Sequence, residues 1–284
     1  MPELPELSAH AGRLERGWAG RTLAGFRPLS FTALKTVAPD PSEAVGRQLS
    51  SVTTRGKYLI AEFDGVAFVV HLMQGGRLRG TAPATGAKAP RGALARWSFE
   101  DADDWLLSEA GREHSAGVWL LDRRDGTSGA EQELLAHLGP DADRLDAAAL
   151  GERLRGRSGR LHNVLRDQQV VAGIGRRLAN DICHLAKLSP FTPTGRLTDA
   201  QAEAVHGALA AVLERDLAFE ATQDELVNTA KRPTNVHRRA GKACPVCGDE
   251  IREVAYVSHV VDYCATCQTG GRILADNTTS KFLK

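Results

Sequence analysis

Two cysteine pairs, Cys244-Pro245-Val246-Cys247 and Cys264-Ala265-Thr266-Cys267, stand near the end of this chain with sixteen residues between them. Each pair can present two thiolates from one tight turn, and the residues between them are enough for a β-hairpin that brings the pairs together. The spacing therefore predicts a tetrahedral four-cysteine site for one structural Zn²⁺ ion. Because four thiolates leave no open coordination position, this ion would stabilise a fold and take no part in catalysis.

The competing interpretation of the four cysteines is a pair of disulfides. Zinc is favoured because the N-terminus does not resemble a signal peptide, and because a chain of 284 residues does not need disulfides to be stable. The fifth cysteine, Cys183, lies in an apolar helical stretch and is interpreted as a small buried hydrophobic residue.

Composition allows two or three domains with apolar cores, and no run of residues is long and apolar enough to cross a membrane. We therefore expect a soluble cytoplasmic protein. The formal net charge is only +1, but residues 231–284 hold nine Lys or Arg and five acidic residues. A basic segment with a zinc site suggests a polyanionic partner, and the simpler alternative is a solvated basic surface.

The first third of the chain has the pattern of β-structure. Residues 58–63 and 66–71 are apolar runs on either side of Asp64-Gly65, which predicts a hairpin with a tight turn. Short strands are also expected at 97–100, 105–107 and 118–121, a helix at 7–18, and a surface loop at 84–92. Gly139-Pro140 ends this pattern, and residues 146–230 are mainly helical.

Within the helical part, residues 160–168 and 176–187 are predicted helices on either side of Val170-Val-Ala-Gly173-Ile-Gly175. Backbone N–H groups of such a turn, together with the start of the second helix, can face a phosphate. Without further context a plain helix–helix connection is the favoured explanation of the glycines.

The N-terminus, Met1-Pro2-Glu3-Leu4-Pro5-Glu6, offers a nucleophile. Removal of Met1 would leave Pro2 as a secondary amine, and an α-amino group titrates close to neutral pH. Such an amine can attack the sugar C1′ atom of a nucleoside and form an iminium intermediate, with Glu3 and Glu6 nearby for proton transfer. An ordinary N-terminal turn with solvated acids is the alternative.

Taken together, these motifs and their order resemble the formamidopyrimidine-DNA glycosylase and endonuclease VIII family of base-excision repair enzymes. Further matching segments are Arg55-Gly56-Lys57, His71-Leu72, Leu138-Gly139-Pro140 and Asp167-Gln168. The resemblance implies an α+β multidomain protein with three parts. These are a catalytic β-sandwich domain at 1–137, a helix–two-turn–helix DNA-binding domain at 138–232, and a zinc finger with a C-terminal tail at 233–284.

By the same resemblance the protein is a bacterial, monomeric, bifunctional DNA glycosylase and abasic-site lyase that binds damaged double-stranded DNA in a cleft and extrudes the lesion base. Pro2 would be the nucleophile, Glu3 the acid and base that assists sugar-ring opening, and Lys57 a cation at the lesion or its phosphates. The residues expected to contact DNA are His71, Arg112, Gly173, Gly175, Arg176, His259 and Arg272. The alternatives are an enzyme with mainly lyase activity and a non-catalytic binder of damaged DNA.

Several positions depart from the family pattern. Arg176 replaces the usual Asn after the second glycine, and His259 replaces the usual finger arginine, for which Arg272 in the tail is another candidate. The residue that fills the space left by the base is either Met73 or Gln74, and the loop at 109–114 is altered. The stretch between Glu225 and Asn235 is short, which predicts weak excision of 8-oxoguanine, although the sequence leaves the preferred lesion open.

Overall fold

The computed structural model describes residues 1–84, 89–110, 114–124, 126, 129–256 and 259–274. The chain forms two compact units. The first contains residues 1–137 and 220–229, and the second contains residues 138–219 and 230–284. Within the described ranges, no helix combines the length and the apolar character that crossing a membrane requires.

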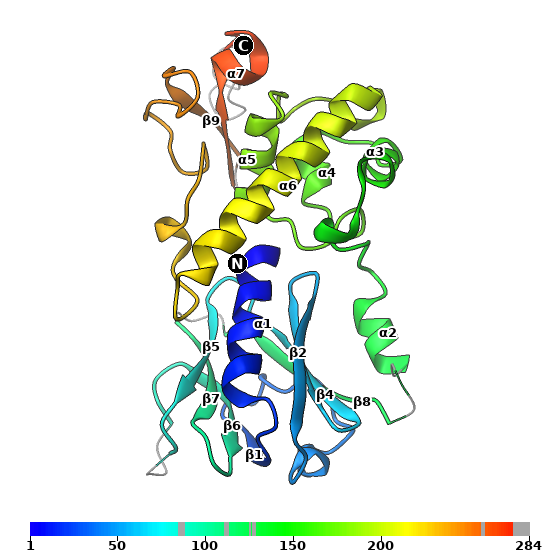
Figure 1. Cartoon of the computed structure of the whole chain (residues 1–284), viewed down its shortest axis with the longest axis vertical. Helices are drawn as coiled ribbons and strands as arrows, with labels where there is room; N and C mark the ends of the chain where they lie inside the picture. The colour runs from blue at the N-terminus through cyan, green and yellow to red at the C-terminus, as the bar shows by residue number, and fades with distance from the viewer. Residues whose placement is uncertain (85–88, 111–113, 125, 127–128, 257–258, 275–284) are drawn as a thin grey trace. The chain divides into compact units, whose positions relative to one another are not determined.

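Two antiparallel four-stranded sheets form most of the first unit (Figure 1). Their inner faces share one core, in which the rings of Phe68 and Trp97 lie 5.5 Å apart at their centroids and Trp97 packs against Trp105. The β-sandwich expected for this part of the chain is confirmed. One sheet has the order β1 (Leu23–Pro28), β6 (Ala93–Phe99), β7 (Asp104–Glu109), β5 (Gly76–Thr81), and the other β2 (Leu49–Arg55), β3 (Tyr58–Phe63), β4 (Val66–His71), β8 (Gly117–Asp122).

Helix α1 (Leu4–Trp18) packs along β2 (Figure 1). Leu7, Ala11 and Leu14 recur at helical spacing on one side and are buried in the sheet core. The helix begins three residues earlier than the sequence pattern indicated. Pro5 is compatible with the first turn because no intrahelical partner exists for its missing N–H.

The predicted hairpin at 58–71 is formed by β3 and β4, with Tyr58 paired to His71 and Phe63 to Val66. Asp64 and Gly65 have φ angles of 29° and 90°, which matches the backbone twist of a two-residue turn between strands. Strands β7 and β8 contain the strands predicted at 105–107 and 118–121, and β6 covers the one predicted at 97–100 except for Glu100. Strands β1, β2 and β5 were not predicted.

Residues after the long helix α6 (Asp199–Ala221) return to the first unit. Leu226 joins the sheet core with 2% of its surface exposed, a burial worth about 1.5–3 kcal/mol. Arg13 of α1 forms an ion pair with Glu220 at 3.3 Å and also donates to the carbonyl oxygen of Gln223. The start of the segment between α6 and the finger is therefore held against α1.

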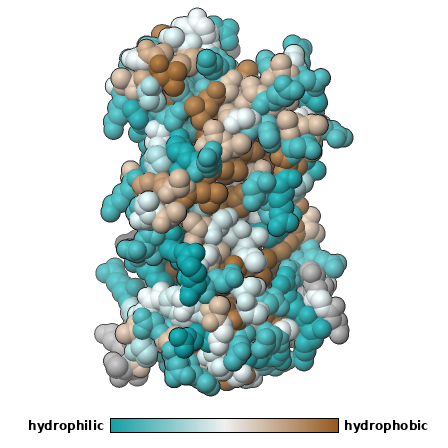
Figure 2. All heavy atoms as spheres, viewed as in Figure 1, coloured by the Kyte–Doolittle hydropathy of each residue, from teal (hydrophilic) through white to brown (hydrophobic). Residues whose placement is uncertain are grey.

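The second unit combines helices with a hairpin. Helix α5 (Arg176–Leu185) packs against strand β10 (Val260–Cys264), and its Asn180 donates to Asp262 at 3.0 Å (Figure 1). The exposed side of α6 is rich in alanine, and hydrophobic colours gather over this helix in Figure 2. The remaining helices and strands are α2 (Gly129–Leu135, in the first unit), α3 (Ala147–Arg155), α4 (Leu161–Leu165), α5 (Arg176–Leu185), β9 (Ile251–Ala255), β10 (Val260–Cys264) and α7 (Ala265–Thr269).

Helix α4 is shorter than the predicted helix at 160–168. It ends at Leu165 because the polar side chains that follow bind the backbone of a turn. Asp167 accepts the N–H of Gln169 at 3.0 Å, and the amide of Gln168 donates to the carbonyl oxygens of Arg166 and Ile174. This turn leads directly into the glycines before α5.

Candidate active site and nucleic-acid interface

The N-terminal residues lie at the start of α1 with their acidic side chains buried. Pro2 is buried, and Glu3 and Glu6 are 6% and 1% exposed. The carboxylate of Glu6 accepts a hydrogen bond from the backbone N–H of Glu3, which is the residue before the first turn of the helix. The helix terminus therefore fixes the backbone next to Pro2.

Charged groups of both signs surround the N-terminal amine. Burial lowers the pKa of the Met1 amine. Glu3 and Glu6 oppose this shift by favouring the charged amine, while Arg77 and Lys57 lower the pKa further. The fold thus brings Glu3, Glu6 and Lys57 near the N-terminal amine. Arg77 on β5 was missed, and its position after Gly75-Gly76 and before the buried Leu78 is the only local signal.

Lys57 occupies the turn between β2 and β3. Arg55 pairs with Tyr58, so that Gly56 and Lys57 form a two-residue turn. Gly56 has a φ angle of 57°, a conformation that glycine adopts without steric cost. Lys57 is half-buried in this turn.

His71 ends β4 beside the same group of charges. Its ring lies 4.6 Å from that of Tyr58, centroid to centroid. Burial lowers the pKa of His71 to about 4, with further contributions from Lys57, His137 and the N-terminal amine. Its Nδ1 atom accepts the N–H of Met73 at 3.2 Å, so that Nε2 carries the proton of the neutral ring. His71 can therefore donate one hydrogen bond.

The segment that follows His71 is tightly turned. Met73 has a φ angle of 48° and is half-buried, whereas Gln74 is exposed. A Cβ atom at Gly76 would lie 2.3 Å from the carbonyl oxygen of Leu72, so this position requires glycine. Nearby, Glu109 accepts the N–H of Ala116 at 2.8 Å and fixes one end of the altered loop. Arg112 lies outside the described residues.

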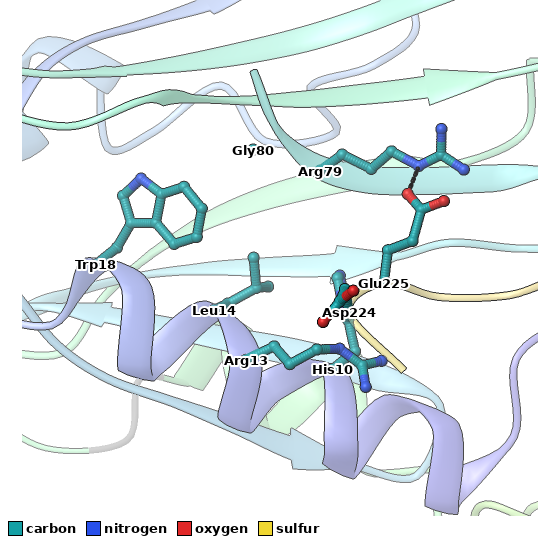
Figure 3. Close-up of a pocket in the computed structure, with 8 residues that line it drawn as sticks. All are labelled: His10, Arg13, Leu14, Trp18, Arg79, Gly80, Asp224 and Glu225. Carbon is teal, nitrogen blue, oxygen red and sulfur yellow. Dashed lines mark ion pairs between the residues drawn. The ribbon is translucent and has the colours of Figure 1, made fainter. Parts of the chain in front are cut away.

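The first unit also contains a pocket of about 250 Å³ next to α1 (Figure 3). An ion pair of 3.1 Å between Arg79 and Glu225 spans one side of it, and His10 is buried at its wall. Burial lowers the pKa of His10 to about 3, with Arg13 as the next contribution. Pro2, Glu3 and Lys57 are absent from its lining. The lining residues are His10, Arg13, Leu14, Trp18, Arg79, Gly80, Asp224 and Glu225.

In the second unit, the predicted glycine turn leads into α5. Gly173 has a φ angle of 97°, and its N–H donates to the side-chain oxygen of Gln168 at 3.0 Å. Gly175 is the residue before the first turn of α5, and Arg176 is the first residue of the helix and half-buried. Gln168 therefore shapes the turn that presents the start of α5.

Aromatic and basic side chains from α4, α5 and the finger form one group. The His259 ring stacks on that of Tyr256 at 4.8 Å and lies parallel to His162 at 6.4 Å. Burial lowers the pKa of His259, and Arg166 and Arg176 lower it further. These residues are therefore close to one another, and His162 and Arg166 were not singled out from the sequence.

Arg272 follows α7, and its side chain is exposed. Its backbone carbonyl accepts a hydrogen bond from the hydroxyl of Thr269 at 2.6 Å. Unlike Arg166 and Arg176, Arg272 does not contribute to the pKa of His259.

The four cysteines of the finger converge as their spacing indicated. Cys244 and Cys267 have their sulfur atoms 3.9 Å apart, and those of Cys247 and Cys264 are 3.4 Å apart. All four are free thiols, so the alternative of two disulfides is wrong for this structure. Hairpin β9–β10 connects the two pairs, and Gly248, with a φ angle of 79°, closes the first knuckle.

A histidine joins this cluster from outside the finger. His184 of α5 places Nε2 at 3.2 Å from the sulfur of Cys244. The ligand atoms of His184, Cys244, Cys264 and Cys267 all lie within 4.8 Å of one another, an arrangement that could hold a metal ion. His184 is 1% exposed and was not predicted, because sixty residues separate it from Cys244.

Comparisons with known proteins agree with these features. Residues 1–112 match the formamidopyrimidine-DNA glycosylase N-terminal domain, and residues 138–227 match the H2TH domain of the same family. Formamidopyrimidine-DNA glycosylase of Chloroflexus aurantiacus is 31% identical over 94% of this chain and 98% of its own length. The enzyme of the same name from Mycobacterium avium is 32% identical over 96% of this chain and 100% of its own length.

Solved structures share the fold. Lactococcus lactis Fpg, in a complex with DNA that contains an abasic site, superposes with a TM-score of 0.82 at 20% identity, covering 94% of this chain and 99% of that one. MutM in a complex with DNA that contains carbocyclic 8-oxo-G gives a TM-score of 0.79 over 94% of this chain and 100% of that one. The α+β architecture is therefore confirmed, and the chain belongs to the formamidopyrimidine-DNA glycosylase family of DNA-repair enzymes.

Proposed function

We propose that this protein is a bifunctional DNA glycosylase and abasic-site lyase that uses Pro2 as its nucleophile. One observation supports this above all: the N-terminal amine lies among Glu3, Glu6, Lys57 and Arg77 within one unit. In the functional division that we propose, residues 1–137 carry the chemistry and residues 138–232 bind DNA. Residues 233–284 form the zinc finger and its tail, and the protein acts as a monomer.

In the proposed reaction the Pro2 amine attacks C1′ of the damaged nucleotide. A nitrogen–carbon bond forms as the glycosidic bond breaks, and the base leaves with the proton that the amine gives up. The C1′–O4′ bond of the sugar then breaks to give an iminium intermediate. Glu3 supplies the proton that ring opening requires and takes it back later. Because the iminium is positive, the buried carboxylates of Glu3 and Glu6 would stabilise it in a site of low dielectric constant.

The environment of the amine suits a nucleophile. Burial lowers the pKa of the Met1 amine, which favours the neutral form that can attack carbon. Once Met1 is removed, the new amine belongs to the buried Pro2, the next residue after the amine whose pKa Lys57 and Arg77 lower. Those cations can also contact the phosphates of the extruded nucleotide.

We propose that the second unit binds the DNA backbone. Three features support this: the glycine turn with Gly173 and Gly175, the start of α5, and the basic group of Arg166, Arg176 and His259. Backbone N–H groups at a helix start and arginine side chains are both donors for phosphate oxygens. Arg272 remains a proposed additional contact, and a neutral His259 would contribute one hydrogen bond without a charge.

We propose that Cys244, Cys247, Cys264 and Cys267 bind one zinc ion. In a tetrahedral site with Zn–S bonds of about 2.3 Å, the sulfur atoms are about 3.8 Å apart. Two of the sulfur pairs here, at 3.4 and 3.9 Å, fit this size. Burial raises the pKa of the Cys264 thiol, and a bound cation would favour its thiolate. When bound, the zinc would supply folding energy for the finger.

We propose that 8-oxoguanine is a poor substrate of this protein. Between α6 and the finger the chain is short, and Leu226, Glu220 and Glu225 hold the start of this stretch in the first unit. A long capping segment over the extruded base is therefore not available from these residues. We expect better turnover of oxidised pyrimidines, ring-opened purines or preformed abasic sites.

Borohydride reduction in the presence of an abasic-site duplex tests the nucleophile. Reduction should trap a covalent protein–DNA product whose peptide map places the link at Pro2. Pro2→Gly should slow trapping while most DNA affinity remains, because the amine is changed and the DNA-binding surface is not. A link at another residue, or an active preparation that retains Met1, would refute the mechanism. A protein that binds the duplex without trapping would be a binder of damaged DNA.

The role of Glu3 requires a separate comparison. Glu3→Gln should abolish base excision, because an amide of similar shape cannot exchange the proton. The matched control is Glu133→Gln, since Glu133 is an exposed glutamate of the same unit. Single-turnover assays would measure the excision rate of both variants. The same assay on duplexes that differ only in the lesion would give the order of substrates. If 8-oxoguanine opposite cytosine is the fastest substrate, the short stretch does not govern specificity.

A further inference from the structure

His184 connects α5 to the cysteine cluster. It lies in the last turn of α5, is 1% exposed, and places Nε2 at 3.2 Å from the sulfur of Cys244. At this distance two roles are chemically possible. Nε2 could carry a proton and donate it to the sulfur, or it could carry a lone pair and take the place of a thiolate on the metal. The position of the proton on the ring decides between them.

The hydrogen-bond partner of the other ring nitrogen, Nδ1, determines which nitrogen carries the proton. Asn235 places its side-chain nitrogen, Nδ2, at 3.3 Å from Nδ1 of His184. The orientation of this amide follows from its other partner, because Arg215 lies 2.8 Å from Oδ1 of Asn235. Arginine has donors only, so the oxygen of the amide must face Arg215 and its NH₂ group must face the histidine. Nδ1 of His184 is therefore an acceptor, and the proton of the neutral ring is on Nε2.

Arg215 is itself held in place by two carboxylates. It pairs with Asp181 and with Asp216, each at 2.9 Å, and both acids are almost fully buried. Asp181 also accepts the backbone N–H groups of Asn235 and Val236. The side chain that orients the amide and the backbone that carries it are thus fixed by the same carboxylate. This network therefore restricts a flip of the Asn235 side-chain amide.

We propose that His184 donates a hydrogen bond from Nε2 to the Cys244 thiolate and is not a ligand of the metal. This rests on the zinc site proposed above. The N–H group faces the negative sulfur, so it orients the thiolate and offsets part of its charge. Partners of this kind behind a metal ligand typically contribute 10–100-fold to metal affinity. His184 is therefore a positioning residue for the four-cysteine site.

The bond also has a structural consequence for DNA binding. Helix α5 begins at Arg176, next to the glycine turn, and ends one residue after His184. One short helix thus carries the proposed phosphate contact at its start and a hydrogen bond to a zinc ligand at its end. Loss of the metal should therefore loosen the end of α5 as well as the finger.

The test uses the full zinc-loaded protein. Metal analysis first establishes that zinc is present. Long-range ¹⁵N–¹H correlation spectra of the histidine rings then report the tautomer of His184, and X-ray absorption at the zinc edge reports the ligand atoms. We expect the Nε2–H tautomer and four sulfur ligands. A tautomer with the proton on Nδ1, or a zinc–nitrogen bond that disappears in His184→Phe, would overturn the proposal.

Two variants measure the energetic effect. His184→Phe removes the donor and should weaken zinc affinity 10–100-fold in a competition with a chelator. His184→Gln keeps an N–H donor and should recover most of that affinity. His206→Phe is the matched control, because His206 bonds to the carbonyl oxygen of Leu145, away from the finger. Equal affinities for wild type and His184→Phe would refute the role of the hydrogen bond. Protein purified without zinc would instead refute the four-cysteine zinc site.

Discussion

His10 should make the stability of the first unit depend on pH. The side chain is 4% exposed at the wall of the pocket in Figure 3, and burial lowers its pKa to about 3. In the unfolded chain the pKa returns to about 6.5. Between these two pKa values, His10 is therefore protonated in the unfolded state and neutral in the folded state. Stability contributed by the neutral His10 is present above about pH 6.5 and is lost as the pH falls toward the folded pKa.

The size of this effect follows from the two pKa values. Between about pH 7.5 and about pH 5, protonation of His10 in the unfolded state should lower the free energy of unfolding by about 2 kcal/mol. His10→Phe removes the titrating group and keeps an aromatic ring in the same space. The variant should therefore lose about 2 kcal/mol less than the wild type over this interval, whatever its stability at neutral pH.

Urea unfolding followed by tryptophan fluorescence provides the assay. All four tryptophans, at positions 18, 97, 105 and 119, belong to the first unit, so their signal reports that unit. The control is His137→Phe, because the side chain of His137 is exposed and should keep the pH dependence of the wild type. Parallel pH dependences for wild type and His10→Phe would show that the buried ring is not kept neutral by the fold.

Three further outcomes are expected in the second unit. Asp216→Ala should cost about 3–5 kcal/mol in unfolding monitored by circular dichroism, because Asp216 is a buried carboxylate that pairs with both Arg177 and Arg215. If Asp216→Ala lowers the free energy of unfolding by less than about 1 kcal/mol, Asp216 does not act as the buried charged partner of these arginines. Cys247→Ser should lower both the zinc content and the DNA affinity, and it should make the salt dependence of DNA binding shallower. An unchanged salt dependence would show that the finger does not contact phosphates. His259→Arg should strengthen binding to all duplexes without changing the order of lesions, since a phosphate contact carries no base information, and a changed order in single-turnover assays would argue for a contact to the base.

Short-range patterns predicted several elements well. The hairpin of β3 and β4 follows from two apolar runs that flank Asp64-Gly65, and all of its information lies within fourteen residues. The same holds for hairpin β9–β10, which the spacing of the two cysteine pairs required. Such elements are decided by turn chemistry and alternation, which act between neighbours in the chain.

Strands β1 and β5 escaped prediction because their own residues carry a weak signal. The sequence of β5, Gly76-Arg-Leu-Arg-Gly-Thr81, has two glycines and two arginines, which are unusual in an isolated strand. It becomes a strand through pairing with β7, about thirty residues further along. The shorter extent of α4 has a similar cause, because Gln168 binds carbonyl oxygens on both sides of the turn that follows the helix.

By itself the sequence determined the family, the N-terminal Pro2-Glu3 motif and the four cysteines, since these depend on residue identity and spacing along the chain. Only the tertiary structure revealed that Arg77 approaches the amine, that Arg166 approaches His259, and that His184 contacts Cys244. Electrostatic interactions and hydrogen bonds depend on distance in space, and these partners are separated by dozens of residues in the chain. No local pattern of residues records such a contact, because it arises only when the sheets and helices pack.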